Sequence, residues 1–258
     1  MNILFDTHAH YDDSKFDDDR DEVIMNAYRS GVGLIINAAS DVETARFSIN
    51  LAKTYDFIYA AVGVHPHEAE SFDEKTAEII EKLASEEKVV AIGEIGLDYY
   101  YDNSPRELQK KCFARQINIA RDVKMPVIIH DRDAHEDTLN IIKRENAKEV
   151  GGVMHCFSGS VEMANELLKN NFYISVGGTL TFKNARRAVE VVKHIPLERL
   201  LIETDCPYLA PEPFRGRRND SSYIKYVAQK VAEIKDISYE SVVDQTMKNG
   251  CALFGINL

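Results

Sequence analysis

Short apolar runs rich in Val, Ile and Leu alternate along the chain with longer, charged segments of helical periodicity. The runs are continuous rather than alternating with polar residues, which is typical of parallel strands covered on both faces. Eight such runs lie at about residues 3–6, 32–39, 58–64, 89–95, 126–130, 151–156, 173–178 and 200–205. Helical spacing of apolar residues is clearest at 17–30, 74–85, 105–122 and 134–145. The order of strand then helix predicts an α/β fold.

Eight repeats of this order predict a TIM barrel, (β/α)8, as a single domain over residues 1–258. No Pro- or Gly-rich linker, low-complexity segment or internal repeat divides the chain, and residues 221–258 read as two closing helices. A doubly wound open sheet is the alternative. It ranks lower because an open sheet would spread apart the polar residues that follow the strands, whereas a closed barrel gathers them on one rim.

Composition sets limits on partners and compartment. The formal net charge of -11 argues against a broad basic surface for nucleic acid, so a polyanionic substrate must be attracted locally. The start of the chain does not resemble a secretory signal, and no apolar stretch is long enough to span a membrane. Four widely spaced cysteines suit a reducing compartment, namely Cys112, Cys156, Cys206 and Cys251. We expect a cytoplasmic monomer that makes no membrane contact.

Imidazoles and carboxylates follow five of the eight predicted strands. His8 and His10 are two residues apart in an extended segment, so both side chains leave the same face and can chelate one ion. Taken singly, each histidine has an ordinary reading as a surface or core residue, while Glu94 could form a buried salt bridge and Asp205 a helix cap. Together they favour a metal site on the rim where barrel active sites lie. The six candidate ligands are His8, His10, Glu94, His130, His155 and Asp205.

The ligand set predicts two divalent cations per chain. We assign His8, His10 and Asp205 to one ion and His130 and His155 to the other, with Glu94 bridging. Four neutral imidazoles and two carboxylates leave the two ions with a net charge of about two positive units, which suits an anionic phosphate. Histidine-rich ligation favours Zn²⁺, although Mg²⁺ or Mn²⁺ with water and substrate oxygens would also be possible. Cys156 and Cys206 adjoin proposed ligands and should point away from the ions in extended backbone.

Several runs resemble the TatD family of metal-dependent deoxyribonucleases, which belongs to the wider amidohydrolase-like superfamily. The resemblance spans nearly the whole chain and is carried by residues 5–10 (FDTHAH), 63–67 (GVHPH), 93–99 (GEIGLDY), 155–159 (HCFSG) and 203–209 (ETDCPYL). It implies a barrel that cuts DNA, often from the 3′ end, by a two-metal mechanism with an activated water. Asp205 and Glu94 would be catalytic, and the resemblance suggests that His65 touches the substrate phosphate.

Substrate contacts are predicted on two loops. Residues 213–219 resemble the basic loop of the family after the eighth strand, and Arg215, Arg217 and Arg218 would bind backbone phosphates. The alternative is that these arginines are only solvated. Tyr99 follows the fourth strand, where an aromatic ring could stack on a base or pack within the loop.

Three functions remain open. The leading hypothesis is a deoxyribonuclease, most simply a 3′-5′ exonuclease on single-stranded DNA or frayed ends, because a barrel pocket admits one strand more readily than a duplex. A second is hydrolysis of a small ester, amide or phosphoester, which would not need the basic loop. A third is a non-catalytic metal-binding interaction protein, which would have to explain an open, carboxylate-bridged pair of ions.

Overall fold

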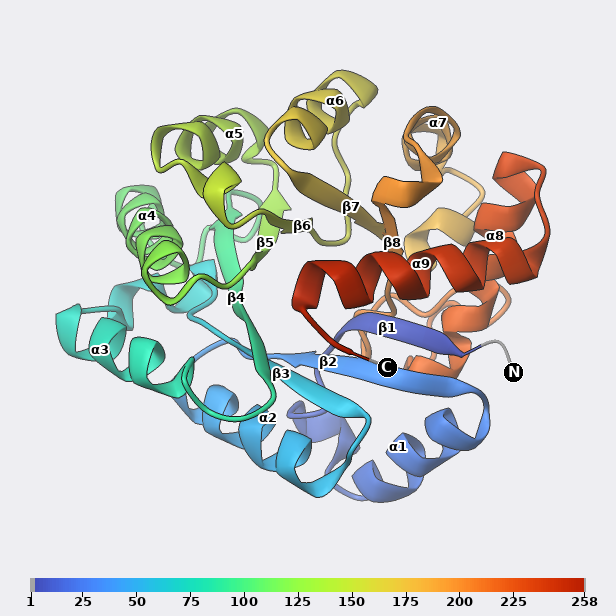
Figure 1. Cartoon of the computed structure of the whole chain (residues 1–258), viewed down its shortest axis with the longest axis horizontal. Helices are drawn as coiled ribbons and strands as arrows, with labels where there is room; N and C mark the ends of the chain where they lie inside the picture. Colours follow the sequence, from blue (N-terminus) through green and yellow to red (C-terminus); the bar gives the residue numbers. More distant parts are fainter. Residues whose placement is uncertain (1–2, 258) are drawn as a thin grey trace.

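The structure is a computed structural model that describes residues 3–257, and it contains one sheet of eight parallel strands in sequential order. The strands are β1 (Leu4–Ala9), β2 (Val32–Ala38), β3 (Ile58–Val62), β4 (Val89–Asp98), β5 (Val127–Arg132), β6 (Gly152–Met154), β7 (Phe172–Val176) and β8 (Leu200–Ile202). All eight predicted strands are confirmed with small shifts of their bounds. The sheet curls into a nearly closed barrel (Figure 1), so the prediction of a TIM barrel is correct and the doubly wound alternative is wrong.

Helices alternate with the strands and surround the sheet (Figure 1). They are α1 (Arg20–Arg29), α2 (Val42–Thr54), α3 (Glu74–Leu83), α4 (Arg106–Val123), α5 (His135–Arg144), α6 (Val161–Lys169), α7 (Arg186–His194), α8 (Ile224–Lys235) and α9 (Tyr239–Phe254). The last two are the closing helices expected from residue 221 onward. No helix within residues 3–257 is both long and apolar enough to cross a membrane.

The barrel closes between β8 and β1 just beyond the end of β8. The backbone N–H of Asp205 donates to the carbonyl of His8 at 2.9 Å, and that of His10 donates to the carbonyl of Cys206 at 2.8 Å. Asp6, buried in β1, accepts hydrogen bonds from the backbone N–H and the hydroxyl of Thr204. Burial raises the pKa of Asp6 to about 7, even though these hydrogen bonds act to lower it. The seam therefore places two candidate ligands at the end of β1, His8 and His10, next to Asp205, which follows β8.

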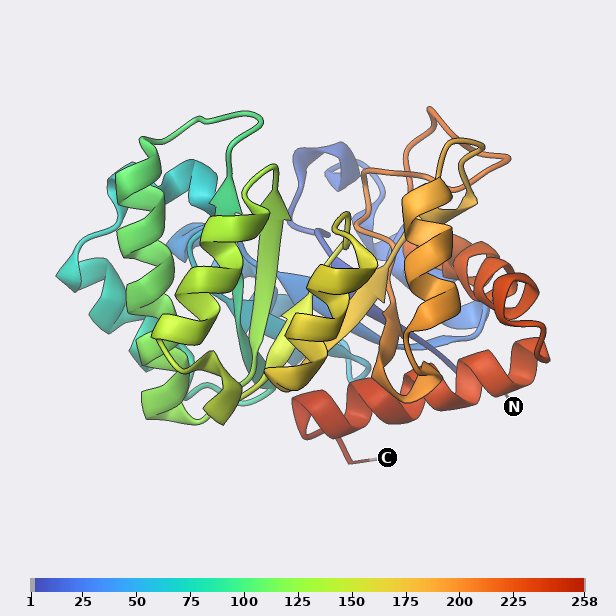
Figure 2. The same ribbon diagram turned by 90° about the horizontal axis from the view of Figure 1, so that it is seen from above.

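Two apolar clusters hold the layers together. The larger lies between the sheet and the surrounding helices. The smaller fills the barrel interior with Phe5, Ile36, Ile128 and Val153, joined by Phe254 of α9. Helix α9 lies across the end of the barrel where the strands begin (Figure 2), which leaves the opposite end as the open mouth.

Candidate metal centre

The inner faces of the strands carry the candidate ligands to the mouth of the barrel. Ile128 and Val153 belong to the cluster inside the barrel. Because side chains alternate along a strand, His130 and His155, two positions further on, face inward as well. The inward-facing positions are thus apolar inside the barrel and are occupied by histidines at its mouth.

Four donor groups meet on the β1 side of the mouth. Nε2 of His8 is 3.0 Å from Nε2 of His10 and 3.2 Å from Oε2 of Glu94. Nε2 of His10 is 3.5 Å from the same Glu94 oxygen and 3.4 Å from Oδ1 of Asp205. Ligand atoms around a tetrahedral Zn²⁺ with bonds of about 2.0–2.1 Å lie about 3.3 Å apart. These spacings therefore fit four ligands of one ion.

A second group meets on the β5–β6 side. Oε1 of Glu94 is 2.8 Å from Nδ1 of His130 and 2.8 Å from Nε2 of His155, and these two nitrogens are 3.3 Å apart. Each oxygen of the Glu94 carboxylate thus faces different imidazoles. In this position the carboxylate would bridge two cations, and the division of ligands inferred from the sequence stays a prediction.

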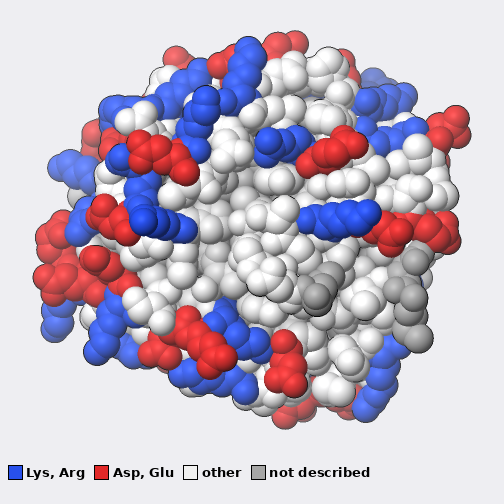
Figure 3. Space-filling model, viewed as in Figure 1, with Lys and Arg blue, Asp and Glu red and all other residues white. Residues whose placement is uncertain are grey.

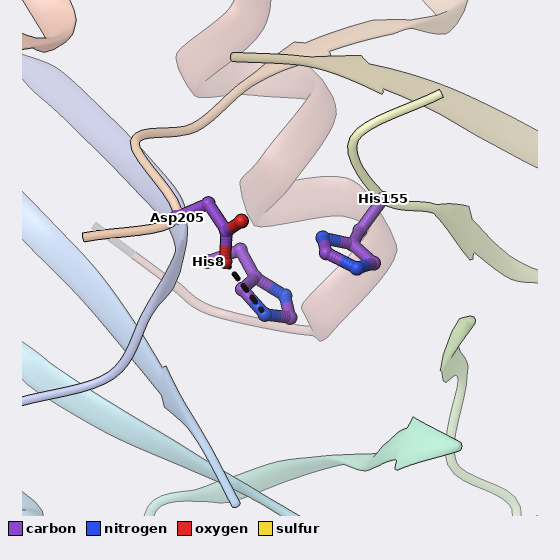
Figure 4. Close-up of side chains that lie close together, drawn as sticks. All are labelled: His8, His155 and Asp205. Carbon is purple, nitrogen blue, oxygen red and sulfur yellow. Dashed lines mark ion pairs between the residues drawn. The ribbon is translucent and has the colours of Figure 1, made fainter. Parts of the chain in front are cut away.

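The two groups are in direct contact. The rings of His8 and His155 stack with their centroids 4.0 Å apart, and Oδ1 of Asp205 lies 3.9 Å from Nε2 of His8 (Figure 4). His8 and Glu94 are almost fully buried, whereas the side chain of Asp205 is 14% exposed. Asp205 therefore lies on the open side of the centre, where solvent and substrate can reach it.

Hydrogen bonds on the far side of the rings direct lone pairs into the centre. Nδ1 of His10 is 2.9 Å from the carbonyl oxygen of Ala38, which can only accept, so His10 carries its proton on Nδ1 and presents Nε2 as a lone pair. Nε2 of His130 is 3.1 Å from Oδ2 of Asp98, which leaves its Nδ1 as the lone pair. Both rings are held in the tautomer that a metal ion requires.

Two carboxylates of this supporting shell, Asp98 and Glu203, were not identified in the sequence. Asp98 orients His130, and Oε1 of Glu203 lies 3.4 Å from Nδ1 of His155 while it accepts the backbone N–H of Cys156 at 2.6 Å. A sequence signal did exist, because each lies an even number of residues from a predicted ligand. Asp98 is four residues after Glu94, and Glu203 is two residues before Asp205. Even spacing in extended backbone places such pairs on one face.

His65 differs from these two rings because it turns an N–H group, not a lone pair, toward the centre. Its Nδ1 accepts the backbone N–H of His67 at 3.2 Å, so its proton lies on Nε2, which is 3.6 Å from Oε1 of Glu94. Burial lowers the pKa of His65 well below its usual value, which keeps the ring neutral. His65 therefore presents an N–H donor to the centre, as a contact to a phosphate oxygen requires.

The electrostatics of the cluster favour positive charge. Burial alone would raise the pKa of Glu94, yet the surrounding imidazoles, led by His155, hold it well below its usual range. Burial alone would lower the pKa of His155, yet the charges of Glu94 and Glu203 raise it well above its usual value. Both shifts show that the buried carboxylates favour positive charge beside them. The donor set and its charge balance thus fit divalent cations.

The three arginines of the predicted basic loop differ in their partners. Arg218 forms a two-pronged ion pair with Asp19, at 2.8 and 2.6 Å. The guanidinium of Arg215 covers the ring of Phe182 at 4.3 Å, and Arg217 makes no ion pair with any described residue. All three are exposed, but none lines the hollows at the mouth. Their phosphate role stays a prediction.

Tyr99 is placed within its loop. Its hydroxyl donates to Asp137 at 2.7 Å, and the guanidinium of Arg106 covers its ring at 4.3 Å. The neighbouring Tyr101, which is 55% exposed, lines the mouth instead. Base stacking by Tyr99 stays a prediction, and the structure favours Tyr101 as the aromatic residue next to the centre.

Two hollows meet at the centre. The first, of about 840 Å³, is lined by Arg132, Arg186 and Arg187, and we call it the arginine cavity. The second, of about 500 Å³, is lined by Asp12, Asp13, Glu68 and Asp98, and we call it the acidic pocket. They share the walls formed by His130, His155 and Asp205, together with Arg132 and Leu209.

The two cysteines next to proposed ligands lie in different surroundings. Cys206 is buried away from both hollows, as expected. Cys156 instead lines the arginine cavity. The reason is that β6 already ends at Met154 and Cys156 has a φ of 42°, so the alternation of an extended strand no longer applies.

Comparison with known proteins agrees with this geometry. Residues 5–255 match the family described as TatD related DNase. The chain is 51% identical over 255 residues, covering 99% of the chain and 100% of the relative, to YabD of Bacillus subtilis (strain 168), named an uncharacterized metal-dependent hydrolase. It is 33% identical over 261 residues, 98% of the chain and 100% of the relative, to a protein of Escherichia fergusonii named 3′-5′ ssDNA/RNA exonuclease TatD.

A solved structure shows the same architecture. The crystal structure of YJJV, a TatD homolog from Escherichia coli K12, superposes with a TM-score of 0.93 at 32% sequence identity and covers 100% of both chains. The fold described above is therefore shared over the full length of this neighbour.

Proposed function

The chain belongs to the family of TatD-related DNases and is a metal-dependent hydrolase acting on ester bonds, and from that premise we propose that it is a deoxyribonuclease. In this proposal residues 1–258 form one catalytic domain that removes nucleotides from the 3′ end of single-stranded DNA or frayed duplex ends. The relative named as a 3′-5′ exonuclease supports the polarity.

The division of the Glu94 carboxylate between two pairs of imidazoles carries the proposal. Oε2 faces His8 and His10, and Oε1 faces His130 and His155. We propose that two divalent cations bind here, with Zn²⁺ favoured by the imidazole ligands and Mg²⁺ or Mn²⁺ as alternatives. Bound at this place, such ions supply Lewis acidity to a phosphate oxygen and make a water acidic at neutral pH.

The residues of the chain then have separate roles in hydrolysis. Asp205, on the open side of the centre, accepts a proton from the attacking water as the new P–O bond forms and the bond to the leaving oxygen breaks. Nε2–H of His65 donates to a phosphate oxygen and stabilises the negative charge that gathers there. Asp98 and Glu203 hold His130 and His155 in position.

A small ester, amide or phosphoester is the second candidate substrate. The volume of the arginine cavity, about 840 Å³, lies within the range of small-molecule sites, which favours this reading. The three arginines on its wall favour an anionic substrate over a neutral one. A non-catalytic metal-binding role is the weakest reading, because the centre opens into both hollows.

A labelled-DNA assay tests the proposal. Metal-stripped protein is reconstituted with Zn²⁺, Mg²⁺ or Mn²⁺ and given single-stranded DNA labelled at its 5′ end, beside Asp205→Asn and Glu94→Gln. Stepwise shortening that needs metal and is lost in both variants supports the proposal. Asp244→Asn, which changes an exposed carboxylate on α9 outside both hollows, is the matched control and should keep its activity. Absence of DNA cleavage with every metal, while the ions still bind, would transfer the search to small esters and amides.

We also propose that the protein is a monomer that works in the cytoplasm. Its four cysteines are free, which suits a reducing compartment. Sedimentation of the purified protein tests the monomer directly.

A further inference from the structure

The two hollows at the centre differ in charge. The arginine cavity lies on the β5–β7 side and contains Arg132, Arg186 and Arg187, against Asp131 and Glu190. Asp131 is engaged by His135, whose Nδ1 lies 2.7 Å from its Oδ2. Apart from the proposed ligand Asp205, the cavity thus carries three guanidinium groups against two carboxylates, in a chain whose net charge is -11.

The arginines of this cavity have no acidic partner. Within the described residues, no carboxylate oxygen lies within 4.0 Å of the guanidinium of Arg132, Arg186 or Arg187. Arg132 instead covers the rings of Tyr100 and Tyr101, at 4.1 and 4.7 Å. Five other arginines do have a carboxylate partner, namely Arg20, Arg106, Arg115, Arg121 and Arg144. Unpaired guanidinium groups in a hollow next to a hydrolytic centre are available to phosphates.

The acidic pocket, on the β1–β4 side, has the opposite character. Besides the proposed ligands it contains Asp12, Asp13, Glu68 and Asp98, and Arg132 on the shared wall is its one cationic lining residue among the described residues. Asp12 accepts a hydrogen bond from Asn37, and Asp13 accepts the hydroxyl of Tyr208. Hydrogen bonds from neutral groups leave the charge of a carboxylate in place, so this pocket repels phosphates.

The walls of the acidic pocket nevertheless suit an uncharged nucleoside. Tyr101 and Tyr208 are 55% and 44% exposed, and both line it. Lys15 contacts the ring of Tyr208 at 4.2 Å but is not among the residues that line the pocket. Exposed aromatic faces stack on bases without regard to sequence, and carboxylates accept hydrogen bonds from sugar hydroxyls.

We infer that the charge difference between the hollows sets the direction in which a strand lies across the centre. The inference rests on the proposed function. The body of the strand, with its phosphates, occupies the arginine cavity, and the terminal nucleoside occupies the acidic pocket. The last nucleoside of an unphosphorylated end has one phosphate, and that phosphate is the one cleaved. Cleavage within a strand would force a further phosphate against Asp12, Asp13 and Glu68, so cutting starts at an end that lacks a terminal phosphate.

Arginine substitutions test the first half of the inference. Arg186→Ala combined with Arg187→Ala removes two charges from the cavity, and Arg29→Ala combined with Arg46→Ala is the control of equal charge change on the exposed faces of α1 and α2. We expect KM for a single-stranded oligonucleotide to rise about ten- to a hundredfold in the first variant, with kcat within about threefold. The slope of log affinity against log salt should fall by about 1.4, the amount for two phosphate contacts on a single strand.

End chemistry tests the second half. Oligonucleotides of one sequence, ending in a 3′ hydroxyl or a 3′ phosphate, are compared as substrates. The wild-type protein should cut the phosphorylated end at least about tenfold more slowly. Asp13→Asn combined with Glu68→Gln should narrow this ratio to about threefold or less, because both amides keep the shape of the pocket without its charge. An unchanged ratio in that variant, or equal rates on both ends in the wild type, would overturn the inference.

Direct binding separates failure of the inference from failure of the nuclease assignment. Fluorescence anisotropy of a labelled oligonucleotide is measured on Asp205→Asn protein with and without the arginine substitutions. If the affinity for the oligonucleotide is the same with and without Arg186 and Arg187, the inference is contradicted, whether or not the protein cleaves DNA. Arginine-dependent binding in a protein that cleaves no DNA supports the strand path and contradicts the proposed function alone.

Discussion

The two ends of the barrel are built from the same strands and differ in what the strands present. At the end where the strands begin, Phe5 packs against Phe254 of helix α9, and among residues 3–257 no candidate ligand lies there. At the mouth, the same inward-facing positions carry buried imidazoles and carboxylates. The space-filling view of the closed end shows charges of both signs around an uncharged centre (Figure 3).

The two ends of the barrel thus have different tasks: the closed end stabilises the fold, and the mouth carries the residues for metal binding and hydrolysis. Apolar burial at the closed end stabilises the barrel without directional demands. Charged groups at the mouth are costly to bury and are tolerated because each faces an opposite charge or a hydrogen-bond partner. Substitutions at the mouth should therefore change metal binding and activity, whereas substitutions at the closed end should change stability.

The largest expected effect comes from Glu94→Gln. The amide keeps the shape of the side chain but cannot bridge two cations with two anionic oxygens. We expect hydrolysis to fall by at least about a thousandfold and bound metal to drop below two ions per chain. Steady-state kinetics and elemental analysis after dialysis measure both. Loss of activity with both ions retained would limit Glu94 to a role other than bridging.

Phe254→Ala, at the closed end, should reduce stability and leave metal binding and activity nearly unchanged. Phe254 is 4% exposed and its ring lies 6.2 Å from that of Phe5, so truncation should reduce the free energy of unfolding by about 3 kcal/mol. Denaturant unfolding measures this, and metal content and kcat should stay within about twofold below the unfolding transition. Leu253→Ala, at a half-buried neighbour, is the control with a smaller loss. A specific loss of metal in folded Phe254→Ala would break the separation between the two ends.

Asp98→Asn tests whether the hydrogen bond with Asp98 keeps the ring of His130 in position to bind a metal ion. Burial acts to raise the pKa of Asp98, but its hydrogen bonds, led by the one with His130, hold it below the usual range, so the carboxylate is ionised. The neutral amide should let the ring of His130 reorient and lower metal affinity about ten- to a hundredfold. Competition with a chelator measures the affinity, with Asp244→Asn as control. Unchanged affinity would show that packing alone orients the ring.

Arg218→Ala should have the smallest effect. Its partly exposed pair with Asp19 joins the loop after β8 to the segment before α1, and such pairs contribute about 0–1 kcal/mol to stability. We expect KM for DNA to change by less than about threefold. A double-mutant cycle with Asp19→Ala measures the pair, and a large rise in KM would instead assign Arg218 to phosphate binding.

Much of the mouth could be predicted from the sequence because strand ends are easy to recognise. A run such as Val127–Ile129 followed by His130 specifies both the strand and the position of its first polar side chain. Closure of the barrel then brings positions as distant as His8 and Asp205 together, while the division of the ligands between two ions stays a prediction.

The remainder depends on contacts that no local pattern encodes. The tautomer of His10 is set by the carbonyl of Ala38, 28 residues away. The pairing of Arg218 with Asp19 joins residues 199 positions apart. Arg186 and Arg187 belong to the first turn of a helix and become part of the mouth only because η4 (Gly178–Thr181) and its loop carry them there.

Anomalous diffraction from a Zn²⁺-loaded crystal would show whether Glu94 bridges two cations. We predict two anomalous peaks, one among His8, His10 and Asp205 and one between His130 and His155, with one Glu94 oxygen on each. A single peak, or two peaks of which only one touches Glu94, would contradict the bridged pair on which the proposed function rests.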